Sequence, residues 1–302
     1  MLDIKNVSKN YDKNTALQNV NITIPSGVCF GLIGPNGAGK STLMKILSGI
    51  IENYEGEVTF EGSDVKTNSH KIKKQIGYVP QDIVLNETLS AVDNLEFFGS
   101  VNGLTSKETK IKAMEVLELV GLMDRGKEAV KTFSGGMKRR INIGCALMHN
   151  PKFIIMDEPT VGVDPQSRNY IFEIIHKLKT QNITVLYSSH YMEEIEHLCD
   201  YIALIDKGSV LENGTIQAIL HKYSTPSIYV EGELITEKMF TSLGKVFTKG
   251  SGFVVENKET LTLLEKITEL LKEDQLEVTR LEIAKPNLED IFLKLTGTSL
   301  RD

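Results

Sequence analysis

One short stretch of the sequence carries residue types that can bind a phosphate chain. Residues 34–41 read GPNGAGKS and match the pattern G-x-x-x-x-G-K-[ST]. The glycines let the backbone curl round an anion, and the free N–H groups of residues 37–42 can point at it from the positive end of a helix. Lys40 would then reach the β- and γ-phosphates of a nucleotide, and Ser41 would hold Mg²⁺.

The segments on either side of this loop have the patterns that a phosphate cradle requires. Residues 28–33 are an apolar run and predict a buried strand that enters the loop. Residues 42–48 predict a short helix that leaves it, with Gly49 as its C-terminal stop. A glycine-rich turn that matches the pattern by chance would not need these flanks, so the sequence favours nucleotide binding.

Two adjacent carboxylates follow a second predicted strand. Residues 153–156 are apolar, and Asp157 and Glu158 come directly after them. Ligands of open α/β sheets bind at the carboxyl ends of the strands. Asp157 suits the shell of a Mg²⁺ ion and Glu158 suits activation of a water molecule. The plain alternative is a capped loop, which the phosphate-binding pattern upstream makes less favoured.

Two side chains follow other predicted strands. Gln81 ends the strand of residues 76–81, and its amide has both a donor and an acceptor, so it could contact a metal-bound water. The alternative is that Gln81 is simply a polar loop residue. His190 follows the strand of residues 183–187, and its neutral ring could donate a hydrogen bond to a terminal phosphate. The other histidines stand in helical or polar contexts and are given no role.

Two further candidates have simple structural alternatives. Tyr11 closes the first strand, where it is either a strand-edge residue or a flat platform for adenine. Ser134-Gly135-Gly136 opens a predicted helix, where it is either an ordinary cap or a second anion site.

The remaining elements frame these residues. Apolar residues alternate with polar ones over residues 17–24 and predict a strand. Residues 89–130 have helical periodicity and predict a helical insertion between strands. Past residue 220 the pattern changes, and strands at 227–230, 252–255 and 276–283 alternate with helices at 261–271 and 286–297. The sequence therefore predicts a small α+β accessory domain after the α/β core.

The composition limits the classes of function. The chain has 302 residues, 41% of them hydrophobic, and a formal net charge of −6, which does not favour nucleic-acid binding. A local basic patch remains possible at residues 138–140. The three cysteines are scattered in apolar surroundings and are predicted to be reduced core residues. The first five residues do not have the pattern of a signal peptide, and no apolar run approaches the roughly 20 residues that span a bilayer. A membrane function would need another chain.

In order and spacing, these motifs resemble those of the ATP-binding-cassette (ABC) ATPases, the motor subunits of ABC transporters. The resemblance covers about residues 1–220 and rests on the set Tyr11, GPNGAGKS, Gln81, FSGGMKRR, FIIMDEP, VGVD and His190. It implies a P-loop NTPase α/β core with an antiparallel β subdomain and a helical subdomain at about residues 88–150. A C-terminal accessory α+β domain would occupy residues 221–302.

The resemblance also implies a role for each matching residue. Tyr11 would stack on adenine, and Asp157 would order Mg²⁺ with Ser41 and Gln81. Glu158 would be the general base and His190 would clamp the γ-phosphate. Gln81 would also report the nucleotide state to a membrane partner. The phosphates would be held by Asn36, Gly37, Ala38, Gly39, Lys40, Ser41 and Thr42.

A second group would act across a subunit boundary. Ser134, Gly135 and Gly136 would contact the γ-phosphate bound to the opposite protomer, and Asp164 would lie at the dimer seam. Because this anion site is expected to be too far from its own loop, we expect a head-to-tail pair with two ATP molecules between its members. Met137 and Phe133 depart from the residues that many family members have there, which could alter the rate.

The function that follows is ATP hydrolysis coupled to export through a separate permease. The closing segment PNLEDIFLKLTG resembles the tail of drug- and ion-export ATPases that pair with ABC-2-type permeases. The chain would lie peripherally on the cytoplasmic side of the membrane, as a homodimer or paired with a relative. The alternatives are a soluble ABC protein acting on ribosomes or DNA and, less favoured, a small-molecule kinase. The accessory domain would serve dimerisation or stability, or else regulation.

Overall fold

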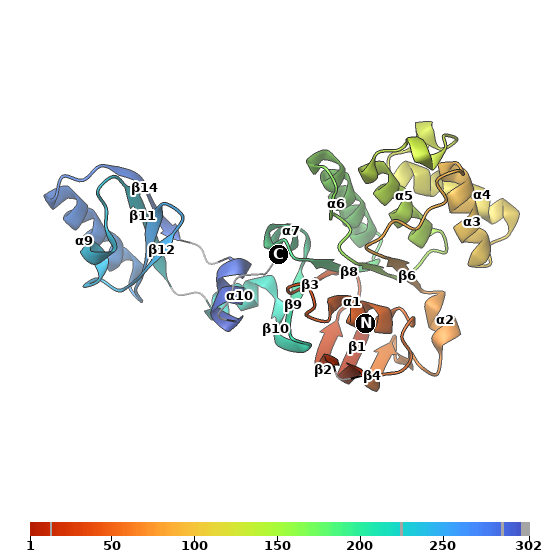
Figure 1. The fold of residues 1–302 in the computed structure, drawn as a ribbon, viewed down its shortest axis with the longest axis horizontal. Coiled ribbons are helices and arrows are strands. Elements are labelled where there is room, and N and C mark those ends of the chain that lie inside the picture. The colour runs from red at the N-terminus through yellow and green to blue at the C-terminus, as the bar shows by residue number, and fades with distance from the viewer. Residues whose placement is uncertain (13, 224–225, 285–286, 297–302) are drawn as a thin grey trace. The chain divides into compact units, whose positions relative to one another are not determined.

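The computed structural model describes residues 1–12, 14–223, 226–284 and 287–296 (Figure 1). The chain divides into two compact units: the first comprises residues 1–216 together with Leu295 and Thr296, and the second comprises residues 217–294. Within the described ranges there are three sheets, two in the first unit and one in the second.

A six-stranded sheet forms the centre of the first unit. Its order is β10 (Ser209–Thr215), β9 (Tyr201–Asp206), β3 (Cys29–Ile33), β8 (Thr184–Ser189), β7 (Phe153–Met156) and β6 (Ile76–Val79). The strands from β9 to β6 pair in parallel, and β10 pairs antiparallel with β9. Every residue of β3, β7 and β8 is buried, as expected for parallel strands that are covered on both faces. Their carboxyl ends therefore meet at one edge.

Helices α6 (Pro165–Thr180) and α7 (Met192–Leu198) connect successive parallel strands, β7 to β8 and β8 to β9. Helix α1 (Lys40–Leu47) follows β3, α2 (Ser69–Lys73) precedes β6, and α8 (Ile216–Tyr223) follows β10. Of these helices, α2, α7 and α8 were not predicted. The buried residues Ile171, Ile174 and Leu178 recur along one face of α6 at helical spacing. The three cysteines are free and buried, as predicted.

An antiparallel sheet packs beside α1. Its order is β2 (Asn14–Ile24), β1 (Leu2–Tyr11), β4 (Glu55–Phe60) and β5 (Ser63–Asp64). Apolar residues face each other across β1 and β2, for example Leu2 with Ile24. These residues join one hydrophobic cluster with Leu43 and Met44 of α1, so burial of this face fixes the helix that follows the phosphate loop.

The range expected for the helical subdomain, about residues 88–150, contains α3 (Ala91–Val101), α4 (Ser106–Leu119) and α5 (Gly135–Leu147), which gather on the side of the first unit away from β1 and β4 (Figure 1). Short 3₁₀ turns at Met123–Arg125 and Val130–Thr132 lead from α4 to α5. Reciprocal capping boxes begin α3 at Ser90 and α4 at Thr105. These caps explain why both helices begin where the sequence changes to helical periodicity.

The second unit has a sheet of its own. The antiparallel order is β12 (Lys245–Lys249), β13 (Gly252–Glu256), β11 (Ser227–Gly232) and β14 (Val278–Ala284). Strand β12 and the 3₁₀ turn Glu237–Phe240 were not predicted. Helix α9 (Thr260–Glu273) buries Leu263, Ile267 and Leu271 in the same cluster as Ile228 and Val255. Helix α10 spans Leu288–Thr296. The predicted flanks of this last helix at residues 286 and 297 lie outside the described residues.

Candidate functional site

The phosphate-binding sequence forms a tight loop between β3 and α1. Gly37 and Gly39 have φ angles of +81° and +106°, which side chains on L-residues rarely adopt. A Cβ atom on Gly39 would lie 2.5 Å from the carbonyl oxygen of Ala16, so the backbone also has no room for one. Within the loop, the buried ammonium group of Lys40 donates to the carbonyl oxygen of Gly34 at 2.7 Å. Glycine is therefore a geometric requirement here.

Three of the predicted residues converge on the carboxylate of a fourth, Glu158. Lys40 Nζ lies 3.2 Å from Glu158 Oε1, and both side chains are at least nine-tenths buried. On the other oxygen, Gln81 Nε2 donates to Glu158 Oε2 at 3.4 Å, and His190 Nδ1 lies 3.6 Å from the same atom. These side chains come from the phosphate loop and from the carboxyl ends of β6, β7 and β8. The parallel sheet thus brings together segments that are far apart in the sequence.

Asp157 lies next to this group and is held by a serine that sequence reasoning did not single out. The hydroxyl of Ser188 donates to Asp157 Oδ1 at 2.9 Å and accepts from the backbone N–H of Glu158 at 2.9 Å. Glu158 has a φ angle of +46°, so its backbone is in the left-handed region. Through these two hydrogen bonds, Ser188 on the neighbouring strand fixes both acidic residues. Close to Asp157, burial and, to a smaller extent, the negative charge of Asp157 raise the pKa of Tyr78 to about 12.

The remaining residues of the phosphate loop lie at its surface or just inside it. Asn36 and Gly37 are exposed, Ala38 is buried, and Ser41 and Thr42 are partly buried in the first turn of α1. Tyr11 ends β1 with 46% of its surface exposed, and Lys9 Nζ lies 4.9 Å from the centre of its ring. An exposed ring at this place can stack on a flat base.

The second predicted anion site belongs to a separate group. Ser134 caps α5 by accepting from the N–H of Met137 at 3.3 Å, and Gly135 has open space where a Cβ would stand. Asp164 caps α6, where its carboxylate accepts from the N–H of Ser167, and this hydrogen bond lowers the pKa of Asp164. Among the contacts of the described residues, none joins this group to the Lys40–Glu158 group.

Close packing at Gly136 holds the two helix starts together. A Cβ atom on Gly136 would lie 2.0 Å from Ser167 Oγ and 3.2 Å from Asp164 Oδ2. Any larger residue would therefore push α5 away from α6. The predicted members Ser134, Gly136 and Asp164 are thus neighbours in space, although they come from two motifs.

The basic patch that the sequence left possible at residues 138–140 does not form, because two of its three side chains are buried. Arg139 and Arg140 are only 4% and 7% exposed, because their guanidinium groups satisfy buried backbone carbonyls. Arg139 donates to the carbonyl oxygens of Pro80, at 2.8 Å, and Gln81. Arg140 donates to that of Val120 at 2.8 Å. Arg139 is therefore a link between α5 and the loop that carries Gln81, which the sequence alone did not reveal.

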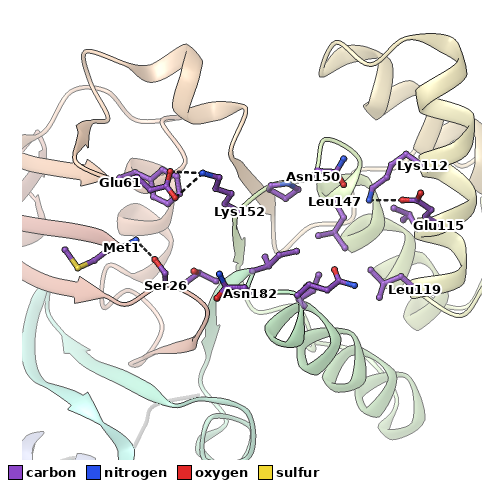
Figure 2. Close-up of a pocket in the computed structure, with 17 residues that line it drawn as sticks. Met1, Ser26, Glu61, Lys112, Glu115, Leu119, Leu147, Asn150, Lys152 and Asn182 are labelled. Atoms are coloured by element: carbon purple, nitrogen blue, oxygen red, sulfur yellow. Dashed lines mark hydrogen bonds and ion pairs between the residues drawn. The ribbon is translucent and has the colours of Figure 1, made fainter.

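A cavity of about 560 Å³ lies at the opposite ends of the strands (Figure 2). Its lining includes Lys152 and Thr184, which stand at the amino ends of β7 and β8, and it contains none of the candidate residues. The lysines that line it are already paired, Lys152 with Glu61 and Lys112 with Glu115. The candidate site is therefore the polar group at the carboxyl ends of the strands.

Comparisons with known proteins agree with this geometry. Residues 17–161 match the family model described as ABC transporter, and residues 214–296 match the C-terminal domain of DrrA1-3-like ATP-binding proteins. The chain is 42% identical to the linearmycin resistance ATP-binding protein LnrL of Bacillus subtilis, over 100% of both chains. It is 34% identical to the Nod factor export ATP-binding protein I of Sinorhizobium fredii, over 100% of this chain and 87% of that one.

Solved structures of ATP-binding cassettes align with most of the chain. A dimeric ATP-binding cassette in a post-hydrolysis state, bound to ADP and Pi, aligns with a TM-score of 0.65 and 28% identity. The alignment covers 72% of this chain and 99% of that cassette. An ATP-binding subunit of an ABC transporter aligns with a TM-score of 0.67 and 29% identity, over 74% and 93% of the two chains.

The fold and site thus define a P-loop ATPase of the cassette type. The chain belongs to the ABC transporter family, as one of its ATP-binding subunits. The predicted fold class, ATP binding and ATPase activity are confirmed. The relatives support the transporter function and not the ribosome- or DNA-associated alternative. Among the described residues, no helix is long and apolar enough to cross a bilayer.

Proposed function

We propose that this chain is the motor of an exporter, in which ATP closes two ATPase subunits and hydrolysis parts them. The observation that carries the proposal is the separation of the candidate residues into two groups. One group surrounds Glu158 and the other lies at the starts of α5 and α6. Each group supplies one side of a hydrolysis pocket, so the second side comes from a companion subunit.

The first group holds the nucleotide and its metal ion. Lys40 binds the β- and γ-phosphates, and the N–H groups of residues 36–42 line the phosphate chain. The side chains of Ser41, Gln81 and Asp157 offer hydroxyl, amide and carboxylate oxygens, the ligands that Mg²⁺ prefers. Bound there, Mg²⁺ would neutralise charge that spreads over the phosphate oxygens. Tyr11 stacks on the adenine ring.

Glu158 acts as the general base. A water in line with the γ-phosphate must lose a proton as it attacks, and the Glu158 carboxylate is placed to accept it. Two side chains orient the Glu158 carboxylate at Oε2: Gln81 donates a hydrogen bond to it, and the His190 ring lies nearby. Lys40 holds the other oxygen, Oε1. His190 then contacts the γ-phosphate when the carboxylate turns to the water.

The second group completes the site of the partner. Ser134, Gly135 and Gly136 present a hydroxyl and bare N–H groups at the start of α5, where the helix dipole favours an anion. Asp164 lies beside them at the seam. A head-to-tail pair of two identical chains would therefore contain two complete sites.

The export partner is proposed to be an ABC-2-type permease. Apolar side chains are exposed in the loop after β6 and on α3, with Val84, Phe97 and Val101 exposed by 54%, 58% and 68%. Phe97 and Val101 are one helical turn apart, so they form one face that can receive an apolar helix. Arg139 ties the Gln81 loop to α5 and gives this face a rigid connection to the site. The chain would then lie peripherally on the cytoplasmic side of the membrane.

A fractionation experiment tests this partner. The chain should co-purify with an ABC-2-type permease from detergent-solubilised membranes, and Phe97→Asp combined with Val101→Asp should release it. Ile111→Asp on α4, which replaces a side chain exposed by 55%, is the matched control and should stay bound. Recovery of the unaltered chain in ribosome or nucleoid fractions would contradict the proposal.

We also propose that the domain at residues 221–302 serves dimerisation or stability and binds no ligand. Its hydrophobic cluster packs α9 against the sheet through residues of this domain alone. Regulation of the ATPase is the alternative. A chain truncated after residue 220 should associate more weakly at a given ATP concentration but keep its maximal rate per dimer, whereas a regulatory domain would change that maximal rate.

A further inference from the structure

A buried carboxylate outside the predicted set collects three hydroxyl groups. Glu194 lies on α7 and is 4% exposed. Its Oε2 atom accepts hydrogen bonds from Tyr187 at 2.7 Å, from Thr160 at 2.9 Å and from Ser189 at 2.9 Å. These donors come from two segments, the strand β8 and the loop that follows β7. One oxygen atom therefore joins both segments to α7.

The hydroxyl donors stand next to residues of the proposed site. Thr160 follows Glu158 by two residues and opens the loop that ends at Asp164, which caps α6. Ser189 directly precedes His190, and its oxygen also accepts from the N–H of Tyr191 at 3.0 Å. The backbone is thus fixed on both sides of His190. A displacement of Glu194 would therefore move both the loop that starts at Thr160 and the loop that carries His190.

The charges around Glu194 suit this arrangement. Burying a carboxylate is costly unless hydrogen bonds satisfy it. Here three O–H donors satisfy Oε2, while Oε1 accepts no hydrogen bond from the described residues. Burial and the negative charge of Glu194 raise the pKa of Tyr187 well above its ordinary value, so its hydroxyl keeps the proton that it donates. Arg168 of α6 places a guanidinium nitrogen 3.9 Å from Glu194 Oε1. An apolar side chain of similar size would fill this space at lower cost, so the carboxylate has a use beyond packing.

We propose that Glu194 is a positioning residue that holds the loop of residues 160–164 and His190 in one fixed arrangement. The inference rests on the proposed function, in which Asp164 faces the companion subunit and His190 faces the chain's own γ-phosphate. Glu194 then links the two faces: closure of the seam at Asp164 moves Thr160, and through the shared oxygen it moves Ser189 and His190. The loop and the ring reach their working positions together.

Replacement by glutamine tests the proposal. Glu194→Gln keeps the shape but removes the charge and puts an N–H₂ group among hydroxyl donors. In phosphate-release assays at varied ATP, we expect kcat to fall by about 10- to 100-fold, as is common for misplaced catalytic groups. The KM for ATP should stay unchanged, because Glu194 makes no contact with the phosphate loop among the described hydrogen bonds. Glu193→Gln, an exposed neighbour on the same helix, should behave as the unaltered chain.

Hydroxyl deletions separate positioning from a general loss of stability. Thr160→Val and Ser189→Ala should each lower kcat with little change in the thermal unfolding temperature. Combined with Glu194→Gln, each should lower kcat no further, because all act through one oxygen atom. If Glu194→Gln fails to fold, the two single deletions decide. Unchanged kcat in them, fully additive losses, or a rise in KM alone would each overturn the proposal.

The outcome for the proposed function is measured separately. His190→Ala in the same assay should lose nearly all turnover. If the unaltered chain hydrolyses no ATP, or if His190→Ala remains fully active, the proposed function is wrong. If His190→Ala is inactive while Glu194→Gln and the hydroxyl deletions keep full kcat, the proposed function stands and the role of Glu194 is overturned.

Discussion

Lys40 and Glu158 form a buried ion pair, with 3.2 Å between Nζ and Oε1. The proposed site assigns the lysine to the phosphates and the glutamate to the attacking water, so the two partners have different tasks during hydrolysis. A phosphate that reaches the ammonium group competes with the carboxylate for it. Nucleotide binding would thereby release Glu158 to accept a proton.

Glu158→Gln tests the role of this carboxylate. Glutamine fills the same space but cannot accept the proton, so phosphate release should fall by at least about 10²-fold. ATP should still bind, and a dimer held by uncleaved ATP should accumulate in gel filtration with Mg²⁺ and ATP. Glu193→Gln serves as the matched control. A monomer under these conditions, or undiminished phosphate release, would count against the assignment.

A mixing experiment tests whether each pocket needs two chains. Ser134→Asp keeps a good N-cap for α5 but places a negative charge against the γ-phosphate, and Lys40→Ala removes the phosphate-binding ammonium. Each variant alone should be inactive. In a mixed pair, one pocket combines the intact loop of the first with the intact Ser-Gly-Gly segment of the second. Random pairing should therefore restore roughly one quarter of the normal rate. Continued inactivity of the mixture would contradict the shared pocket.

The contact between Gly136 and Ser167 predicts a destabilising variant and its rescue. A Cβ atom on Gly136 would overlap Ser167, so Gly136→Ala should lower the free energy of unfolding by about 1–3 kcal/mol and reduce ATP hydrolysis. Ser167→Gly removes the obstructing atoms and should recover most of the activity in the double variant. Thermal unfolding and phosphate release measure both effects. Normal behaviour of the single variant would show that α5 and α6 are not packed as described.

The lowered pKa of His149 predicts that the free energy of unfolding depends on pH. Burial lowers its pKa below the ordinary value near 6.5, although its ring lies 3.2 Å from the carbonyl oxygen of Ile76. As the pH falls through about 6.5, the unfolded chain binds a proton that the folded chain does not, so this contribution to stability is lost towards acid, by at most about 1.4 kcal/mol per pH unit. Urea unfolding between about pH 5.5 and 8 should show a shallower decline for His149→Gln than for the unaltered chain. Parallel curves would rule this contribution out.

The sequence by itself determined the local elements and the identity of the chemistry. The strand, loop and helix around GPNGAGKS, the two acids after β7 and the periodicity of the helical insertion are patterns within one segment each. Backbone conformation and side-chain alternation follow from neighbouring residues, so such patterns can be recognised without the fold. The sequence did not predict the short helices α2 and α7, because five to seven residues show too little periodicity to be recognised.

Only the tertiary structure decided which residues meet. Gln81, Glu158 and His190 converge because three parallel strands end at the same edge, and Arg139 is buried because carbonyl groups of a distant loop accept its hydrogen bonds. The three hydroxyl groups on Glu194 are likewise a product of packing between segments. Contacts of this kind depend on how strands are ordered and how deeply a side chain is buried, and neither is encoded in the spacing of one motif.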